Sequence, residues 1–348
     1  MTVATKAAGA EFVASRLQEY GELARLKLWE YLRTGRQPQN LYELAAEYPK
    51  RGGRNLRASL CIAAARCFGA STADSLDSAV ALELLHNSFL VHDDVEDESE
   101  QRRGLPTLHV LHGVPTAVNV GDALAVLSLR PLLRNCSLLG GRLGLRILEE
   151  AESMARESVE GQALELEWRR ANVTNLLPAD YLQMILKKTC WYTTIYPCRV
   201  GAIIGTRDSV DLERFVPFGF FLGAAFQIQD DLLNLVGDAD RYGKELSGDL
   251  LEGKRTLMLI HLLHHASGER RRKISQMLGL PRASRTARQA AWVLDAMSDH
   301  GSLEYARGVA HALAGAATHE FAKAFANTAS SDARSFLEAL PTWVIART

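Results

Sequence analysis

A group of acidic residues ends one apolar segment of the chain. Asp93 and Asp94 are adjacent, and Asp97 follows Asp93 at a spacing of four. On a helix, residues four apart share one face, about 6 Å apart along the axis. Like charges so placed repel unless a cation lies between them, and Mg²⁺ favours a few carboxylates together with waters and phosphate oxygens. Alone, the pattern is equally typical of an acidic helix end that faces solvent.

A second acidic pair favours the interpretation as a metal site. Asp230 and Asp231 end another apolar segment far along the chain, within the stretch Phe226–Asn234. Two such pairs predict two facing walls that could hold Mg²⁺ ions around a diphosphate. His and Cys are absent at ligand spacing, which argues against zinc.

Basic residues lie near both pairs. The stretch Arg51–Arg57 combines a Gly-Gly pair with guanidinium groups, which could hold a phosphate. Arg102–Gly104 follows the first acidic pair, Lys187–Thr189 lies in an apolar segment, and Lys244 and Lys254 follow the second pair. The spacing of a nucleotide-binding P-loop is absent, so a diphosphate is the better candidate ligand.

The elements that must position these residues are predicted to be helices. Apolar residues recur at spacings of three and four in Ser75–His92, and no alternating strand pattern is present. Further helices are predicted over Leu143–Arg169, Ala179–Gly205, Val210–Val236, Leu250–His265, Ala283–Ser298 and Ser302–Asn327. The predicted fold class is all-α, with residues 1–348 forming a single domain in which long helices surround a central apolar cavity.

Two local features carry their own expectations. Pro197 and Pro217 fall inside helical patterns and are expected to kink them. The basic cluster Gly268–Lys273 is predicted to be a solvated loop between two helices.

The composition narrows the function classes. The chain of 348 residues carries 40 Lys and Arg against 41 Asp and Glu, so no nucleic-acid partner is predicted. Its 5 Cys are odd in number, which indicates free thiols in a reducing compartment and a cytoplasmic location. We expect no signal peptide, because the first residues lack a long apolar stretch. We expect no membrane span, because no run of about 18 apolar residues occurs.

Taken together, these residues resemble the trans-isoprenyl diphosphate synthases, the polyprenyl synthetase family that includes geranylgeranyl and farnesyl diphosphate synthases. The resemblance extends from about Tyr48 to Ala346. Its strongest stretches are Leu84–His109, Gly161–Trp168, Met184–Gly205, Phe226–Asp238 and Tyr242–Leu263. It implies the isoprenoid synthase type I fold, a homodimer, and a prenyltransferase that joins isopentenyl diphosphate to an allylic diphosphate. The apolar stretch Val118–Leu133 is a candidate for the dimer interface.

The resemblance also assigns roles to single residues. Asp93, Asp97 and Asp230 would bind Mg²⁺, three ions per active site, with Asp94 and Asp231 in support. The residues that would hold the allylic diphosphate are Arg102, Lys188, Lys244 and Lys254. The metal-free pocket for isopentenyl diphosphate would consist of Arg54, Arg57, His86 and Arg103. Thr189 and Gln227 would lie near the reacting carbons. The departing pyrophosphate would take the proton, so no protein base is required.

The sequence departs from the family pattern at four positions. Arg54 stands where the family often has Lys, and Ala58 stands where it often has Pro. Arg keeps the charge of Lys and adds bidentate reach. Asn234 ends the second acidic motif in place of Asp, and Glu165 replaces a common Asp.

The sequence leaves alternatives for the length of the product and for the function. In the family, aromatic residues four and five positions before the first Asp limit product length, and here these positions hold Phe89 and Ser88. One aromatic residue predicts a C20 product, geranylgeranyl diphosphate, with farnesyl diphosphate as the next choice. A class I terpene cyclase would not need the metal-free pocket, and a non-catalytic subunit of a heteromeric synthase would commonly lose an Asp motif.

Overall fold

The computed structural model describes residues 3–32, 37–237 and 247–347, and within them the chain is almost entirely helical. The α-helices are α1 (Val3–Tyr31), α2 (Gln39–Ala45), α3 (Glu47–Lys50), α4 (Leu56–Cys67), α5 (Thr72–Glu96), α6 (Leu108–His112), α7 (Val114–Leu138), α8 (Gly141–Arg170), α9 (Pro178–Ile185), α10 (Tyr196–Thr206), α11 (Phe215–Val236), α13 (Gly248–Glu252), α14 (Leu257–His265), α15 (Gly268–Leu278), α16 (Ala287–Asp299), α17 (Ser302–Ala324) and α18 (Asp332–Ile345). A π-helix, η1 (Leu186–Ile195), and two 3₁₀-helices, η2 (Leu212–Arg214) and η3 (Arg282–Ser284), complete the helical elements. The predicted all-α class is confirmed.

The described residues contain one pair of strands. β1 (Gln101–Arg102) and β2 (Leu105–Pro106) pair antiparallel, directly after the first acidic motif. Arg103 and Gly104 form the turn with φ values of 55° and 73°, a conformation that Gly adopts without strain. The sequence analysis predicted no hairpin here, because the strands are two residues long and show no alternation.

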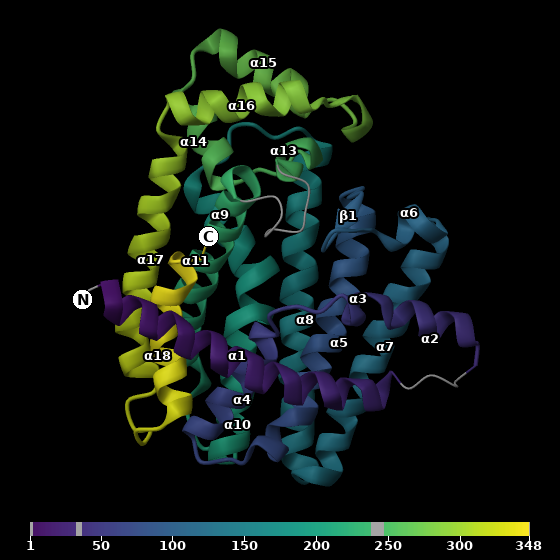
Figure 1. Ribbon diagram of the computed structural model, residues 1–348, viewed down its shortest axis with the longest axis vertical. Coiled ribbons are helices and arrows are strands. Elements are labelled where there is room, and N and C mark those ends of the chain that lie inside the picture. Colours follow the sequence, from purple (N-terminus) through teal and green to yellow (C-terminus); the bar gives the residue numbers. More distant parts are fainter. Residues whose placement is uncertain (1–2, 33–36, 238–246, 348) are drawn as a thin grey trace.

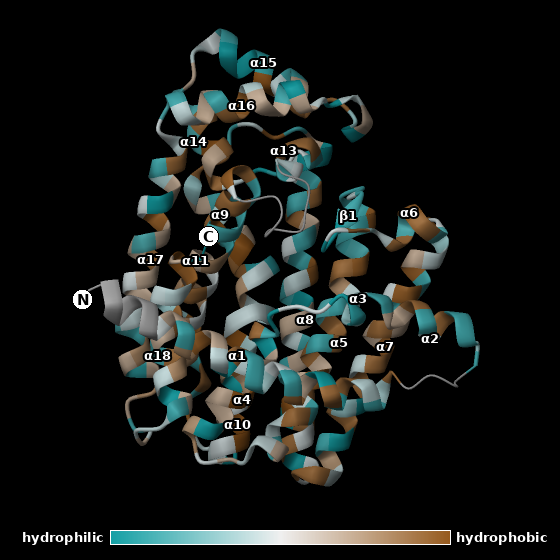
Figure 2. Ribbon diagram, in the orientation of Figure 1, coloured by the Kyte–Doolittle hydropathy of each residue, from teal (hydrophilic) through white to brown (hydrophobic). Residues whose placement is uncertain are grey.

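The long helices lie roughly parallel and enclose the centre of the molecule (Figure 1). α5 packs against α7 and α4, η1 packs between α8 and α11, and α11 packs against α17. α1 crosses one face of this bundle, while α15 and α16 cover one end. Many of the hydrophobic residues along α5, α7 and α11 face neighbouring helices, whereas α15 is largely hydrophilic (Figure 2).

Local signals explain where α5 begins and how it runs. Ser71 caps the helix, since its side chain accepts from the Asp74 amide while the Asp74 carboxylate accepts from the Ser71 amide. The residues that follow are mostly small or aliphatic and are buried on most sides. α5 is therefore a core helix that carries its acidic end to the middle of the bundle.

Several predicted boundaries were wrong in detail. The predicted helix Ala179–Gly205 divides into α9, η1 and α10, with Pro197 in the first turn of α10. Pro217 lies in the first turn of α11, where a missing N–H costs nothing, so it does not kink the helix. The cluster Gly268–Lys273 is not a loop but the start of α15, which Ser267 caps.

α7 has one buried and one exposed apolar side. Leu124 and Val120 are buried against the bundle, whereas Val126 and Leu133 are 66% and 58% exposed. Among the described residues α7 is the one helix long and apolar enough to cross a membrane, and 44% of its most apolar window is buried in the protein. Its exposed side falls within the predicted interface stretch Val118–Leu133.

Candidate active site

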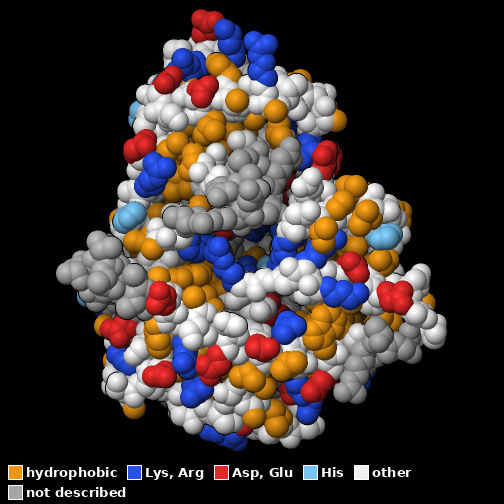
Figure 3. Space-filling model, viewed as in Figure 1, with side chains coloured by type: hydrophobic (Ala, Val, Ile, Leu, Met, Phe, Trp, Pro, Cys, Tyr) orange, Lys and Arg blue, Asp and Glu red, His pale blue; other side chains and the backbone are white. Residues whose placement is uncertain are grey.

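A cavity of about 1370 Å³ opens at the centre of the bundle. Residues of α1, α4, α5, α8, η1, α11 and α18 line it. Lys and Arg side chains gather around a hollow on the face viewed in Figure 3. The cavity is larger than the usual range for small-molecule sites, about 300–1,000 Å³, so it could hold two substrates.

The first acidic motif places its carboxylates in three different environments. Asp93 lines the cavity, with its carboxylate 3.2 Å from Lys188 Nζ and 3.4 Å from Arg102 Nη2. Asp94 points away from the cavity and is buried. Tyr48 Oη donates to it over 2.5 Å, and Arg102 Nε donates to both of its oxygens over 2.8 Å. Asp94 thus holds the Arg102 side chain in place.

Asp97 does not line the cavity. Its carboxylate is fully buried and pairs with Arg169 of α8 and with Lys254, whose Nζ is 2.7 Å away. Burial, together with the charge of Asp93, raises the pKa of Asp97 to about 7. Lys254 also pairs with Glu252 over 2.8 Å, so a buried ion cluster connects the end of α5 to the segment after α13.

The second acidic motif is arranged in a similar way. Asp230 lines the cavity, 3.5 Å from Arg347 Nη1. Asp231 is buried and accepts hydrogen bonds from Tyr181 Oη and Gln227 Nε2, each over 2.7 Å. Burial, with a smaller contribution from Asp249, raises the pKa of Asp231 to about 8. In each motif the second Asp is buried and held by a Tyr hydroxyl, but Asp231 still borders the cavity beside Asp230, whereas Asp94 does not border it.

Asn234 has a structural partner. Its side-chain oxygen accepts from the Asp249 amide over 3.1 Å, and its backbone oxygen accepts from the Ser247 amide over 2.8 Å. These bonds attach the start of α13 to α11. The departure from Asp at this position therefore keeps an acceptor for a backbone amide.

The π-helix η1 carries three side chains into the cavity, from Lys188, Thr189 and Tyr192. π-helical turns are rare in proteins, and those that do occur are often found at functional sites. The close approach of α8 requires Gly161, because a Cβ there would lie 2.2 Å from the Lys188 amide nitrogen. Thr189 Oγ1 donates to Gln227 over 3.1 Å, which joins η1 to α11.

Glu165 of α8 forms an ion pair with Lys188. Burial is the largest single influence and would raise the pKa of Glu165, but the charges of Lys188 and Lys254 and the hydrogen bond from Lys188 together outweigh it and hold the pKa below its usual value. Glu165 therefore stays ionised and helps to orient Lys188 toward Asp93.

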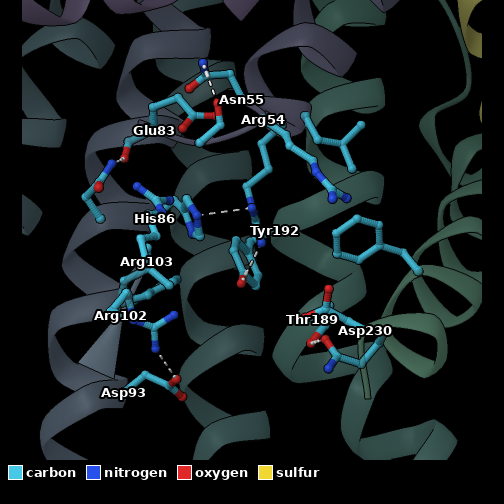
Figure 4. Close-up of a pocket in the computed structure, with 18 of the residues that line it drawn as sticks. Arg54, Asn55, Glu83, His86, Asp93, Arg102, Arg103, Thr189, Tyr192 and Asp230 are labelled. Atoms are coloured by element: carbon cyan, nitrogen blue, oxygen red, sulfur yellow. Dashed lines mark hydrogen bonds and ion pairs between the residues drawn. The ribbon is translucent and has the colours of Figure 1, made fainter. Parts of the chain in front are cut away.

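A further basic group lies on α4, α5 and the β1–β2 turn, along the same wall of the cavity as Asp93 but displaced from it (Figure 4). Arg57 Nη1 lies 3.3 Å from His86 Nε2, and Arg103 Nη1 donates to the Tyr48 backbone oxygen over 3.1 Å. Burial, with the charges of Arg57 and Arg103, holds the pKa of His86 well below its usual value. Arg54 reaches the cavity with its guanidinium 5.8 Å from the Trp343 ring centroid.

The two chain-length candidates differ in position. Phe89 lines the cavity and packs edge-on against Tyr192, with ring centroids 5.6 Å apart. Ser88 is buried, does not line the cavity, and donates to the Gly121 backbone oxygen of α7 over 2.8 Å. Ser88 therefore lies on the side of α5 that faces α7, because adjacent residues on a helix point about 100° apart.

The other predicted site residues line this cavity, apart from Asp94 and Asp97, which are buried beside it, and Lys244, which lies outside the described residues. Five further polar residues at the site were not predicted from the sequence: Tyr48, Arg169, Tyr181, Tyr192 and Arg347. Each contacts a predicted site residue from a distant part of the chain. Tyr192 alone carried a local signal, since it follows Lys188 at helical spacing.

Comparisons with known proteins agree with this geometry. The polyprenyl synthetase family profile matches residues 38–297. The short chain isoprenyl diphosphate synthase of Methanothermobacter thermautotrophicus is 32% identical over 299 residues, 84% of this chain and 87% of that protein. The geranylgeranyl pyrophosphate synthetase of Pyrococcus horikoshii superposes with a TM-score of 0.84 at 30% identity, over 97% of this chain and 99% of that one. A polyprenyl synthase of Caulobacter crescentus, solved with calcium and isoprenyl diphosphate, gives 0.83 at 27% identity, covering 96% and 98%. This chain belongs to the polyprenyl synthetase family.

Proposed function

We propose that this chain is a Mg²⁺-dependent trans-prenyltransferase that condenses isopentenyl diphosphate with an allylic diphosphate to give geranylgeranyl diphosphate. The observation that carries the proposal is the composition of the cavity. Asp93 and Asp230 line it from two different helices, and the group of Arg57, His86 and Arg103 lines it at a separate place. One site can bind a diphosphate through metal ions, and the other can bind a second diphosphate without metal.

The donor set fits Mg²⁺. Among the described residues, no group of three or more His, Cys, Asp or Glu could hold a metal ion by itself, so the substrate must supply part of the coordination. Asp93 and Asp230 would each supply a carboxylate, and substrate oxygens would complete the coordination, which is the usual way Mg²⁺ binds. The metal would neutralise the charge that develops on the leaving diphosphate. Three ions per site and ligation by Asp97 remain part of the proposal.

The chain's own residues would supply the remaining steps. Lys188 and Arg102 lie beside Asp93 and would bind the allylic diphosphate as it departs, with Lys254 behind them. Arg54, Arg57 and Arg103 would hold isopentenyl diphosphate. Thr189 and Gln227 line the cavity, Thr189 beside Asp230 (Figure 4), and would border the reacting carbons. The departing pyrophosphate would accept the proton, so no protein base is needed.

The C20 product is proposed from Phe89 and from the relatives. Phe89 lies one helical turn from Asp93 on the cavity wall, and one turn is about 5.4 Å, close to the length of an isoprene unit. The Pyrococcus horikoshii protein, which is 30% identical, is a geranylgeranyl pyrophosphate synthetase. Farnesyl diphosphate remains the alternative product.

Two further features support an active homodimer over the rival functions. The basic pocket is retained, which a cyclase would not require, and both Asp motifs are retained, one of which a non-catalytic subunit would commonly lose. The exposed apolar side chains of α7, such as Val126 and Leu133, would form the dimer interface. We place the enzyme in the cytoplasm because its five cysteines are free.

The test is an assay of the purified protein with Mg²⁺, isopentenyl diphosphate and each allylic primer in turn, followed by sizing of the dephosphorylated products. We expect a C20 product that forms only when both substrates and metal are present. Product from a single allylic diphosphate would indicate a cyclase, and no product with any primer would refute the proposal.

A further inference from the structure

Tyr192 contacts residues of both substrate regions. It projects from η1 between the α5 side chains on one wall and Thr189 and Asp230 on the other (Figure 4). Arg57 Nη2 donates to the Tyr192 hydroxyl over 2.8 Å, and the Arg57 guanidinium lies 4.3 Å from the ring centroid. Phe89 packs edge-on against the same ring. A single side chain therefore lies between the basic pocket and the cavity wall that borders the growing chain.

The hydroxyl of Tyr192 fixes Arg57. One guanidinium nitrogen of Arg57 bonds to this hydroxyl and another lies 3.3 Å from His86 Nε2. A free Arg side chain carries about 2 kcal/mol of rotamer entropy, so holding it before the ligand arrives strengthens binding. Arg57 Nε and His86 Nδ1 are buried, and among the described residues neither has a hydrogen-bond partner. These two nitrogens remain for a ligand once Tyr192 has set the orientation of Arg57.

The ring of Tyr192 fixes Phe89. The two rings lie at 89° with centroids 5.6 Å apart, an arrangement that aromatic pairs favour. The ring also lies beside His86, with centroids 5.9 Å apart, so neighbours on α4 and α5 constrain its position. Without this ring, Phe89 would face open cavity and could rotate away from its present position.

We propose that Tyr192 is a positioning residue with two separable roles: its hydroxyl orients Arg57 for isopentenyl diphosphate, and its ring holds Phe89 as a limit on product length. This rests on the proposed function, because it takes Arg57 as part of the isopentenyl diphosphate pocket. It predicts that two properties, affinity for isopentenyl diphosphate and product length, depend on different atoms of one side chain.

Two variants separate these atoms. Tyr192→Phe removes only the hydroxyl, and Tyr192→Ala removes the ring as well. For Tyr192→Phe we expect KM for isopentenyl diphosphate to rise about tenfold or more, as for loss of a hydrogen bond to a charged group, with unchanged primer KM and unchanged product length. Tyr192→Ala should give the same rise in KM together with longer products. Tyr305→Phe is the control, since its ring stacks on His261, and Tyr305 does not line the cavity.

A binding measurement separates positioning from a general structural effect. Calorimetry with isopentenyl diphosphate alone, without metal or primer, should show the same loss of affinity for Tyr192→Phe. In the double variant Arg57→Lys/Tyr192→Phe, the losses of affinity from the two single substitutions should not add, because each substitution removes the same contact between Arg57 and the Tyr192 hydroxyl. A thermal unfolding curve checks that each variant is folded, and Tyr192→Phe remains informative if Tyr192→Ala does not fold.

The outcomes are distinct from failure of the proposed function. If wild-type protein forms no prenyl diphosphate, the proposed function fails. If wild-type is active and Tyr192→Phe changes the KM of isopentenyl diphosphate less than about twofold, or changes both KM values equally, the role of the hydroxyl is refuted. If folded Tyr192→Ala keeps the wild-type product distribution, the role of the ring is refuted.

Discussion

The adjacent residues Asp93 and Asp94 should respond oppositely to the same substitution. Asp93 faces the cavity, and both cations beside it have a second carboxylate partner: Arg102 has Asp94, and Lys188 has Glu165. Asp93→Asn therefore leaves no buried cation unpaired, and we expect the free energy of unfolding to change by less than about 1 kcal/mol. Loss of one electrostatic group at the reacting diphosphate should lower kcat by about 10²–10³-fold, or about 3–4 kcal/mol.

Asp94 has the opposite environment. It is fully buried, and its oxygens accept from Tyr48 and Arg102 over 2.5 to 2.8 Å. Breaking a buried charged pair by removing one partner costs about 3–5 kcal/mol. We therefore expect Asp94→Asn to lower the free energy of unfolding by several kcal/mol, because the Arg102 charge loses its counter-ion.

The assay pairs urea unfolding with steady-state kinetics at saturating Mg²⁺. Asp122→Asn is the control, because Asp122 is an exposed carboxylate on α7, with its Oδ1 3.4 Å from His92 Nε2. It should change neither quantity. If Asp93→Asn retains near-normal kcat, or if Asp94→Asn is as stable as wild type, the division of roles between the two carboxylates is incorrect.

Four further expectations follow from the contacts described. Asp97→Ala should lower both stability and turnover, since Arg169 loses its ion-pair partner and Lys254 keeps only Glu252 and Asp249, and urea unfolding that matches wild type would contradict this. Phe89→Ala should shift products toward longer chains in the sizing assay, and an active variant with unchanged products would exclude Phe89 as a limit. Light scattering at micromolar concentration should give a dimer mass, and Val126→Glu combined with Leu133→Glu should give a monomer mass; a monomeric wild type would refute the interface. Burial and neighbouring imidazoles hold the pKa of His261 below its usual 6.5, so protonation favours the unfolded chain and stability falls as pH drops below that value; His261→Gln should reduce this slope, measured by urea unfolding between about pH 7 and 5.

The sequence was sufficient to predict that Asp93 and Asp230 line one cavity. The prediction succeeded because each ends an apolar helix and because charge at such a position requires a counter-ion. It also identified Arg57 and Lys188, whose types and neighbours suit a phosphate, whereas His86 was assigned only through the resemblance to the family. These inferences depend on local pattern alone, which is retained whatever the tertiary packing.

The parts that failed depend on direction and on distant contacts. Asp97 follows Asp93 in helical geometry, since its amide donates to the Asp93 backbone oxygen, but its carboxylate is buried against Arg169 and Lys254, two partners that spacing along the sequence does not indicate. Ser88 was named only as the non-aromatic residue at a chain-length position of the family, and its hydrogen bond to the Gly121 backbone oxygen of α7 had no signal in the sequence. Arg169 and Arg347 could not be found from spacing, because the chain returns them to the motifs from far away.

The π-helix η1 makes the length of its segment a functional property. A turn of η1 contains more residues than an α-helical turn does, so deletion of a residue shifts this segment toward ordinary helix geometry. Residues on one side of the deletion would then rotate by about 100° relative to the other side. Lys188 and Tyr192 could no longer face the cavity together, while the helix itself would remain intact. Related chains should therefore tolerate substitutions in this segment more readily than insertions or deletions, and a deletion scan should show a sharp loss of turnover here without loss of helical content.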